Sequence, residues 1–212
     1  MSNNNTIVIV DYNMGNLRSV EKGFARVGAD VKISQDHGMI RDAAKIVLPG
    51  VGAFGDGMRN LHDLGLVEVL NQEVLGNSKP FLGICLGMQL VSSQSFENTP
   101  TKGFGWIKAD VIRFDHSNEM EKIKIPHVGW NNVVYQHGNP LFKGIPDNSD
   151  FYFVHSYHFQ SSEDIVTSTT EYGYSFTSSI QKQNIFAFQF HPEKSQQYGL
   201  KILKNFSELV ME

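Results

Sequence analysis

The chain has 212 residues, of which 41% are hydrophobic and 19% are charged, and its formal net charge is −4 at pH 7. The absence of a basic excess argues against nucleic acid as a partner, and the single cysteine excludes an intrachain disulfide and a multi-cysteine metal site. The N-terminus lacks the basic and apolar regions of a signal peptide, and the longest apolar runs are far too short to span a membrane. We therefore expect a soluble, cytoplasmic protein without metal or cofactor, in which residues 1–5 are disordered.

Strand and helix patterns alternate in the first third of the chain. The β-branched run at 7–10 predicts a buried strand, and residues 16–27 carry apolar side chains at helical spacing, with Gly28 placed to end that helix. Further strands are predicted at 31–33, 45–48 and 81–84, and a helix at 66–75. This order predicts a mostly parallel central sheet flanked by helices.

From about Phe104 the predicted segments become short and β-rich. Strands are predicted at 110–114, 122–125, 132–135, 151–154, 165–170, 175–180 and 185–190, and a helix at 197–210. We expect these strands to form an added antiparallel sheet and the closing edge of the main sheet. Because no long linker divides the sequence, residues 1–212 are expected to form one α/β domain.

Cys85 is the centre of a G-x-C-x-G motif at 83–87, between an apolar strand and a helical pattern. Glycines two residues before and two residues after the thiol leave room for a strained strand-to-helix turn that exposes a nucleophile. The N-terminus of the following helix favours the thiolate. The motif therefore predicts a nucleophilic thiol, whereas a cysteine outside such a motif is more often a buried structural residue.

His191 is the strongest candidate for the base among the eight histidines, because it follows the predicted strand 185–190 and precedes Pro192. A following proline favours an extended backbone at His191. In an extended segment, Glu193 would lie on the same side of the chain as His191 and could orient its ring. Cys85, His191 and Glu193 are thus the predicted catalytic triad.

A glycine-rich loop follows the third predicted strand, with glycines at 50, 52 and 55 in the spacing of a dinucleotide-binding loop. We reject that role because the loop does not follow the first strand, Pro49 precedes it, and the acidic residues about twenty positions later lie in a predicted helix. We expect the loop to form an oxyanion hole, in which backbone N–H groups of Val51 and Gly52 act together with that of Leu86.

Together these features resemble the triad-type, class-I glutamine amidotransferases along nearly the whole chain, which implies their flavodoxin-like fold. Within that family, the sequence resembles the glutaminase subunits of imidazole glycerol phosphate synthase, an enzyme of histidine biosynthesis. The segments that carry this closer resemblance are 11–20, 49–56, 126–131, 151–157 and 191–195.

The resemblance implies that Cys85 attacks the side-chain amide of glutamine and that ammonia and glutamate are released. It also implies the contacts with the substrate. Gln89 would bind glutamine, Glu97 would pair with its ammonium group, and the loop of His155, Ser156 and Tyr157 would hold its carboxylate end.

The family resemblance further implies a partner, a (β/α)₈ cyclase subunit that receives the ammonia. Asn13, Asn16, Trp130 and Lys194 match positions on the docking face of such glutaminases. The oxyanion hole of these enzymes forms fully only when the partner binds its nucleotide, and glycines 50 and 52 are the residues whose backbone freedom could permit that change.

Other functions remain open at this stage. A paralogous glutaminase could supply ammonia to a sugar amidotransferase in surface-polysaccharide synthesis, a group that the segments 105–107, 157–158, 170–180 and 199–201 resemble. A non-catalytic regulatory subunit is a second alternative, although Cys85, His191 and Glu193 are all present. A thiol hydrolase of another γ-glutamyl compound is a third, and it would have no use for docking residues.

Overall fold

The structure is a computed structural model that describes residues 5–115, 123–136 and 138–211. The strands are β1 (Ile7–Val10), β2 (Val31–Ser34), β3 (Lys45–Gly50), β4 (Phe81–Cys85), β5 (Gln94–Ser95), β6 (Thr101–Lys102), β7 (Ala109–Arg113), β8 (His127–Tyr135), β9 (Ser149–His155), β10 (Tyr157–Ser161), β11 (Val166–Glu171), β12 (Ser175–Lys182) and β13 (Ile185–Phe188). The helices are α1 (Leu17–Arg26), α2 (His37–Asp42), α3 (Phe54–Asp63), α4 (Leu66–Leu70), α5 (Leu86–Leu90) and α6 (Gln196–Ser207), with a π-helical turn η1 (Asn71–Gly76) and 3₁₀ turns η2 (Pro140–Phe142) and η3 (Pro192–Lys194).

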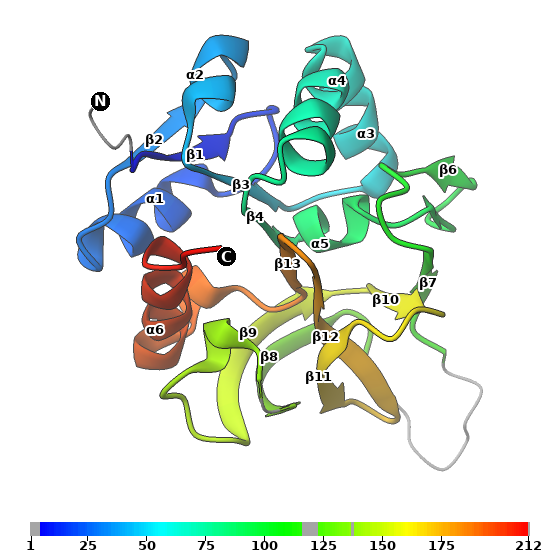
Figure 1. The fold of residues 1–212 in the computed structure, drawn as a ribbon. Coiled ribbons are helices and arrows are strands. Elements are labelled where there is room, and N and C mark those ends of the chain that lie inside the picture. Colours follow the sequence, from blue (N-terminus) through cyan, green and yellow to red (C-terminus); the bar gives the residue numbers. More distant parts are fainter. Residues whose placement is uncertain (1–4, 116–122, 137, 212) are drawn as a thin grey trace.

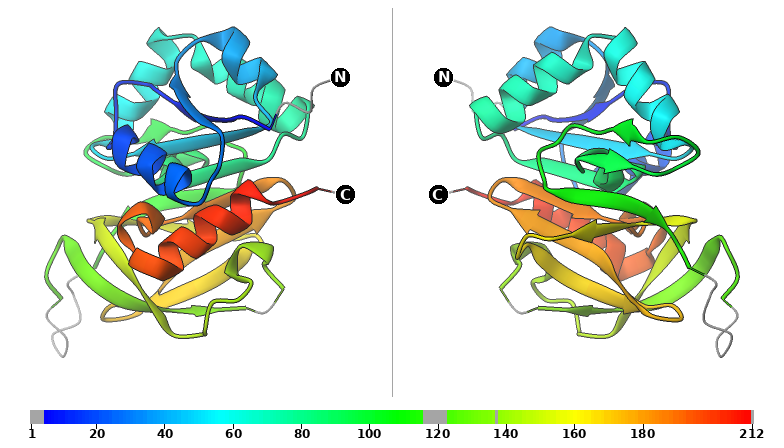
Figure 2. Two further views of the ribbon diagram at one scale, coloured as in Figure 1. Left: turned by 90° about the vertical axis from the view of Figure 1, so that its left-hand side faces the viewer. Right: turned by 90° about the vertical axis from the view of Figure 1, so that its right-hand side faces the viewer.

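The upper half of the fold in Figure 1 is a parallel sheet in the order β2-β1-β3-β4-β13. β1 is buried on both faces, and its side chains alternate between two apolar cores. Val8 and Val10 pack with helices α2 to α5, whereas Ile7 and Ile9 pack with α1 and α6. Figure 2 shows α1 and α6 together on one side of this sheet. The predicted parallel sheet flanked by helices is confirmed.

The lower half is antiparallel except for the parallel pair of β5 and β7. β12 pairs with β13 and continues the sheet through β10 and β7, and the short strands β5 and β6 complete this edge. A second layer is built from β11, β8 and β9, in which β8 and β9 run antiparallel from the His127–His155 pair to the Val133–Ser149 pair. This arrangement confirms the predicted antiparallel addition, and it brings the end of β9 next to β4 at the centre of the molecule (Figure 1).

Several predicted boundaries are wrong. The strand expected at 122–125 is absent over 123–125, and residue 122 lies outside the described residues. Pro126 has no backbone N–H to donate, so pairing begins one residue later, at His127. Most of the expected tail 1–5 also lies outside the described residues. The helix predicted at 66–75 is present, but its second half is the π-helical turn η1.

Helices α2 and α3 and strand β10 were not predicted from the sequence. Gly55 and Gly57 lower the helix propensity of α3, yet its apolar face, with Phe54, Met58 and Leu61, is buried in the core. The polar residues of β10 obscure its alternation, although it pairs with β7 over its whole length. Among the described residues, no helix is both long enough and apolar enough to cross a membrane.

Candidate active site

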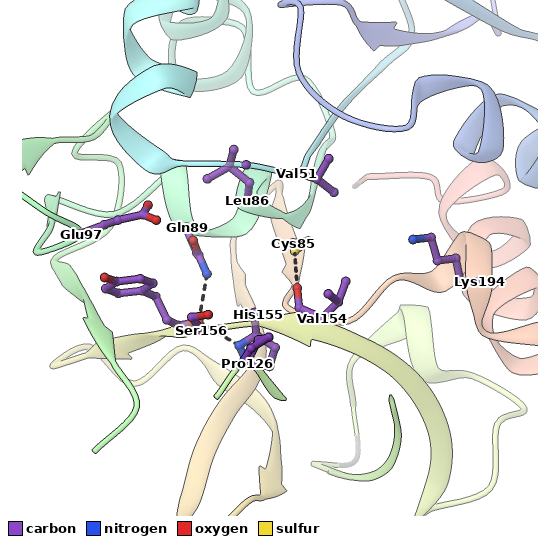
Figure 3. Close-up of a pocket in the computed structure, with 12 residues that line it drawn as sticks. Val51, Cys85, Leu86, Gln89, Glu97, Pro126, Val154, His155, Ser156 and Lys194 are labelled. Atoms are coloured by element: carbon purple, nitrogen blue, oxygen red, sulfur yellow. Dashed lines mark hydrogen bonds between the residues drawn. The ribbon is translucent and has the colours of Figure 1, made fainter. Parts of the chain in front are cut away.

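The carboxyl ends of β1, β3, β4 and β13 meet at one edge of the parallel sheet, because neighbouring parallel strands end on the same side. At this edge lies a cavity of about 470 Å³. It is lined by residues of the glycine-rich loop, the β4–α5 junction, strand β9 and the turn into β10 (Figure 3). They are Val51, Gly52, Cys85, Leu86, Gln89, Glu97, Pro126, Val154, His155, Ser156, Tyr157 and Lys194.

Cys85 occupies a strained junction between β4 and α5. Its backbone angles, φ 54° and ψ −108°, define a conformation that a residue with a side chain rarely adopts. A Cβ at Gly83 would lie 2.7 Å from the Gly87 carbonyl oxygen, and a Cβ at Gly87 would lie 1.7 Å from the Leu48 carbonyl oxygen. Both glycines are therefore required by close backbone packing, which explains the motif and directs the Cys85 side chain into the cavity (Figure 3).

His191 and Glu193 form a buried pair near Cys85. The His191 Nδ1 atom lies 2.8 Å from Glu193 Oε1, and both side chains are almost completely buried. His191 has the expected extended backbone, but Glu193 reaches it through the 3₁₀ turn η3 and not along an extended segment. The predicted contact therefore exists, whereas the predicted backbone path to it is wrong.

The electrostatic environment of His191 favours the imidazolium. Burial alone would lower its pKa, but the neighbouring Cys85 and the Glu193 carboxylate outweigh burial and raise the pKa of His191 to about 10. The His191 Nε2 atom is buried and meets no hydrogen-bond partner at bonding distance among the described residues. We therefore attribute the effect of Cys85 on His191 to charge and not to a formed hydrogen bond.

The three residues predicted for the oxyanion hole, Val51, Gly52 and Leu86, all line the cavity. Gly52 has a φ of +113°, a conformation that favours glycine. Gly50 does not have a positive φ. Glycine is required at this position because a Cβ there would lie 2.0 Å from the Tyr12 hydroxyl oxygen. The expectation that Gly50 supplies backbone freedom is thus not supported by its conformation.

The five residues predicted to bind the substrate also line the cavity: Gln89, Glu97, His155, Ser156 and Tyr157. The Gln89 amide nitrogen donates to the Tyr157 carbonyl oxygen at 3.1 Å (Figure 3). Glu97 accepts a hydrogen bond from the backbone N–H of Phe54 at 2.7 Å, so one carboxylate oxygen stabilises the start of α3. Glu97 therefore has a structural contact in addition to its place at the cavity.

The His155 ring is buried and is held by two hydrogen bonds. Its Nδ1 lies 2.8 Å from the Tyr157 carbonyl oxygen, and its Nε2 lies 3.1 Å from His127 Nδ1. Burial lowers the pKa of His155 to about 3 and that of His127 to about 4, so both rings are neutral at pH 7. The ring of His155 thus connects β9 and β10, and both of its nitrogens are already bonded. The groups of this loop that can face a substrate are the backbone, Ser156 and Tyr157.

The residues predicted on the docking face fall into two exposed groups. Trp130 is 47% exposed, and its ring centroid lies 6.0 Å from that of Tyr152. The Lys194 ammonium group lies 5.5 Å from the Tyr152 ring centroid, and Lys194 also lines the cavity. Asn13 and Asn16 are exposed in the turn between β1 and α1, at the same edge of the sheet as Cys85.

Sequence reasoning missed three buried residues beside the site: Tyr12, His127 and Gln189. Tyr12 contacts the glycine-rich loop, His127 bonds to His155, and the Gln189 side chain bonds to both Cys85 and Gln89. Gln189 and His127 stand within segments already singled out, directly before Phe190-His191 and after Pro126. The described residues contain no cluster of three or more His, Cys, Asp or Glu side chains that could hold a metal ion.

Comparison with known proteins agrees with this geometry. Residues 8–209 match the family described as glutamine amidotransferase class-I. The chain is 50% identical over 209 residues to the imidazole glycerol phosphate synthase subunit HisH 1 of Methanococcus maripaludis, covering 96% of this chain and 100% of that protein. It is 45% identical over 203 residues to HisH 1 of Campylobacter jejuni, with the same coverage, and 49% identical over 205 residues to HisH of Moorella thermoacetica, with 96% and 95% coverage.

Solved structures support the fold. PurLQS from Thermotoga maritima has a TM-score of 0.70 at 16% identity, with coverage of 95% of this chain and 96% of that chain. A glutamine amidotransferase from the same organism has a TM-score of 0.59 at 20% identity, with coverage of 89% and 76%. The chain belongs to the class-I glutamine amidotransferases and, within them, to the group of HisH subunits of imidazole glycerol phosphate synthase.

Proposed function

We propose that the protein is the glutaminase subunit of an imidazole glycerol phosphate synthase, which hydrolyses glutamine and passes the ammonia to a cyclase subunit. The observation that carries this proposal is that Cys85 and Gln89 line one cavity while the buried His191–Glu193 pair lies beside Cys85, outside the cavity lining. A strained, cavity-facing thiol beside a charged histidine is the arrangement required for acyl transfer.

The proposed reaction proceeds through a thioester. The Cys85 proton is first held by His191, whose ring Glu193 orients, and the resulting thiolate attacks the side-chain amide carbon of glutamine. His191 then gives this proton to the leaving nitrogen, so the C–N bond breaks and ammonia departs. Water attacks the thioester with His191 as base, the C–S bond breaks, and glutamate leaves with the thiol restored.

The cavity supplies the remaining groups for this reaction. Backbone N–H groups of Val51, Gly52 and Leu86 would stabilise the oxyanion, since all three residues line the cavity beside Cys85. Gln89, Glu97 and the turn of residues 155–157 would bind the rest of the glutamine. The carboxylate of Glu97, which lines the cavity, suits the ammonium group of the substrate.

The proposed partner is a (β/α)₈ cyclase subunit, in keeping with the subunit names of the relatives. Its docking face would include Asn13, Asn16, Trp130 and Lys194. Lys194 and Tyr152 connect the cavity to the exposed Trp130 ring, which supports a route for ammonia on this side. The single domain over 1–212 and the cytoplasmic location stay predictions.

A second acceptor for the ammonia deserves a test, because Methanococcus maripaludis contributes two relatives, HisH 1 and HisH 2, at 50% and 46% identity. A duplicated glutaminase could supply a sugar amidotransferase with the same chemistry. The regulatory, non-catalytic alternative is opposed by the intact Cys85–His191–Glu193 arrangement.

The deciding experiment measures ammonia release from glutamine by the purified chain, alone and with the cyclase subunit of the same organism and its nucleotide ligand. The Cys85→Ala variant is the control. Strong stimulation by the loaded cyclase, abolished in the variant, is the expected result. Activity that is indifferent to the cyclase would refute the histidine pathway and favour the sugar acceptor, and silence in every mixture would refute the glutaminase itself.

A further inference from the structure

Gln189 lies two residues before His191, and its side chain is fully buried between Cys85 and Gln89. Its Nε2 donates to the Cys85 sulfur at 3.7 Å, and its Oε1 accepts from Gln89 Nε2 at 3.0 Å. Gln189 is absent from the described lining of the cavity. It therefore acts on a bound substrate only through these two neighbours.

The hydrogen-bond network fixes the orientation of the Gln189 amide. Because Gln89 donates to Gln189 Oε1, the NH₂ group of Gln189 must face the sulfur. The reversed amide would place two NH₂ groups against each other and an oxygen against the sulfur. Gln189 thus presents a donor to Cys85 by necessity.

The same network fixes Gln89. Its amide nitrogen donates to Gln189 Oε1 and to the Tyr157 carbonyl oxygen, which uses both of its hydrogens. That carbonyl also accepts from the His155 ring, so both of its lone pairs are occupied. The remaining polar atom of Gln89 is its Oε1, and this acceptor is what the side chain can offer to a substrate.

The sulfur of Cys85 has a second contact, the Val154 carbonyl oxygen at 3.9 Å, to which the thiol donates. When the proton leaves the sulfur, this contact ceases to be a hydrogen bond because both atoms are then acceptors. The N–H donor of Gln189 keeps its role toward the anion and toward the thioester sulfur. Gln189 is therefore suited to hold the sulfur in place through the whole cycle.

We propose that Gln189 is a positioning residue that holds the Cys85 sulfur and fixes the Gln89 amide, so that the nucleophile and the substrate-binding acceptor are set by one side chain. This proposal rests on the proposed glutaminase function. Gln189 would have two separable effects: its Nε2 atom acts on the Cys85 sulfur, and its Oε1 atom acts on the Gln89 amide.

Two variants separate these effects. Gln189→Glu keeps an oxygen for Gln89 but turns a carboxylate oxygen toward the sulfur, so kcat should fall by about tenfold or more while KM for glutamine stays within about twofold. Gln189→Met loses both contacts at similar volume, so kcat should fall and KM should rise by about fivefold. The matched control is Asn184→Asp, which alters a buried amide at the other end of β13, where the Nδ2 group donates to the Val74 and Lys79 carbonyl oxygens. It should lower Tm and leave kcat and KM of the folded enzyme unchanged.

A second readout does not depend on glutamine turnover. Because the chain has a single cysteine, the rate of alkylation by iodoacetamide reports on Cys85 alone. Gln189→Glu should slow alkylation at pH 7.5 by about tenfold, since the carboxylate repels the anionic sulfur. If Gln189→Glu does not fold, the alkylation rate of Gln189→Met is compared with that of the wild type and reports the loss of the N–H donor.

The outcomes are distinguishable. Variants that match the wild type in kcat, KM and alkylation rate, with only Tm changed as in the control, would overturn the proposal for Gln189. If the wild type with its loaded cyclase releases no ammonia, the proposed function fails. The alkylation rates then decide on Gln189 by themselves, with slower rates in its favour and equal rates against it.

Discussion

Tyr12 carries a hydroxyl group that is fully buried beside the glycine-rich loop and has no hydrogen-bond partner among the described residues. Burial, and then the neighbouring Cys85, raise the pKa of Tyr12, so the group stays neutral. The hydroxyl oxygen occupies the space that a Cβ at Gly50 would need, at 2.0 Å from that position. The replacement Tyr12→Phe removes this oxygen and leaves the ring in place.

We expect Tyr12→Phe to stabilise the protein. A buried hydroxyl without a partner costs about 1–3 kcal/mol. Its removal leaves a void of about 15 Å³, which costs about 0.4 kcal/mol at about 24 cal/mol per Å³. The net gain of about 0.6–2.6 kcal/mol corresponds to a rise in Tm of about 1–10 °C for a chain of this size.

A double-mutant cycle with Gly50→Ala tests the same geometry. In the wild-type background the added methyl group meets the Tyr12 oxygen and also lies 3.0 Å from Leu86 Cβ, so it should cost about 1–3 kcal/mol. In the Tyr12→Phe background the cost should fall by about 1 kcal/mol. Urea unfolding of the four proteins measures these values. A Tyr12→Phe variant less stable than the wild type, or an equal cost of Gly50→Ala in both backgrounds, would refute the reasoning.

Three further predictions concern the histidines and their partners. The folded pKa of His155, about 3, lies below its unfolded value, so this neutral ring contributes stability that is complete above about pH 6.5 and is lost as pH falls toward 3. At about 1.4 kcal/mol per pH unit, the free energy of unfolding of the wild type, relative to that of His155→Gln, should fall by about 2 kcal/mol between pH 7 and 5. Urea unfolding that finds the same difference at both pH values would contradict this. Cys85→Ala should lower the pKa of His191 from about 10, because one of the two groups that raise it is removed, and an NMR titration that finds the pKa unchanged would disprove the coupling. Glu193→Gln should reduce kcat by about 10²- to 10⁴-fold with little change in KM, and wild-type turnover in steady-state kinetics would rule out an orienting role.

The parallel half of the fold and the centre of the site could be predicted because their signals are local. The run Ile7–Val10 is apolar on both faces because the strand is buried on both faces, and the glycines around Cys85 mark backbone contacts too close for any Cβ. The pairing of His191 with Glu193 also lies within one short segment. In each case the signal stands within a few neighbouring residues, even where the contact that causes it, as between Gly87 and Leu48, joins distant segments.

The other parts of the fold and the site could not be predicted because they depend on contacts between segments that are distant in the sequence. Gln189 meets Cys85 across 104 positions, and His127 meets His155 across 28, so no local pattern distinguishes these side chains from ordinary buried amides and imidazoles. Gly50 shows the same limit: its glycine was assigned to backbone freedom, whereas the structure assigns it to the Tyr12 hydroxyl. Helix α3 was missed because burial of Phe54, Met58 and Leu61 in the core outweighs the low helix propensity of its glycines.

In the proposed mechanism Cys85 is a nucleophile that faces the cavity lined by Gln89 and Glu97, and His191 holds its proton. The most direct measurement is covalent capture by a glutamine analogue that carries an electrophilic ketone, followed by intact mass and peptide mapping. We expect one adduct per chain, located on Cys85, slowed by excess glutamine and by His191→Asn, and absent in Cys85→Ala. An unmodified chain, or labelling of Cys85 that glutamine does not slow, would contradict it.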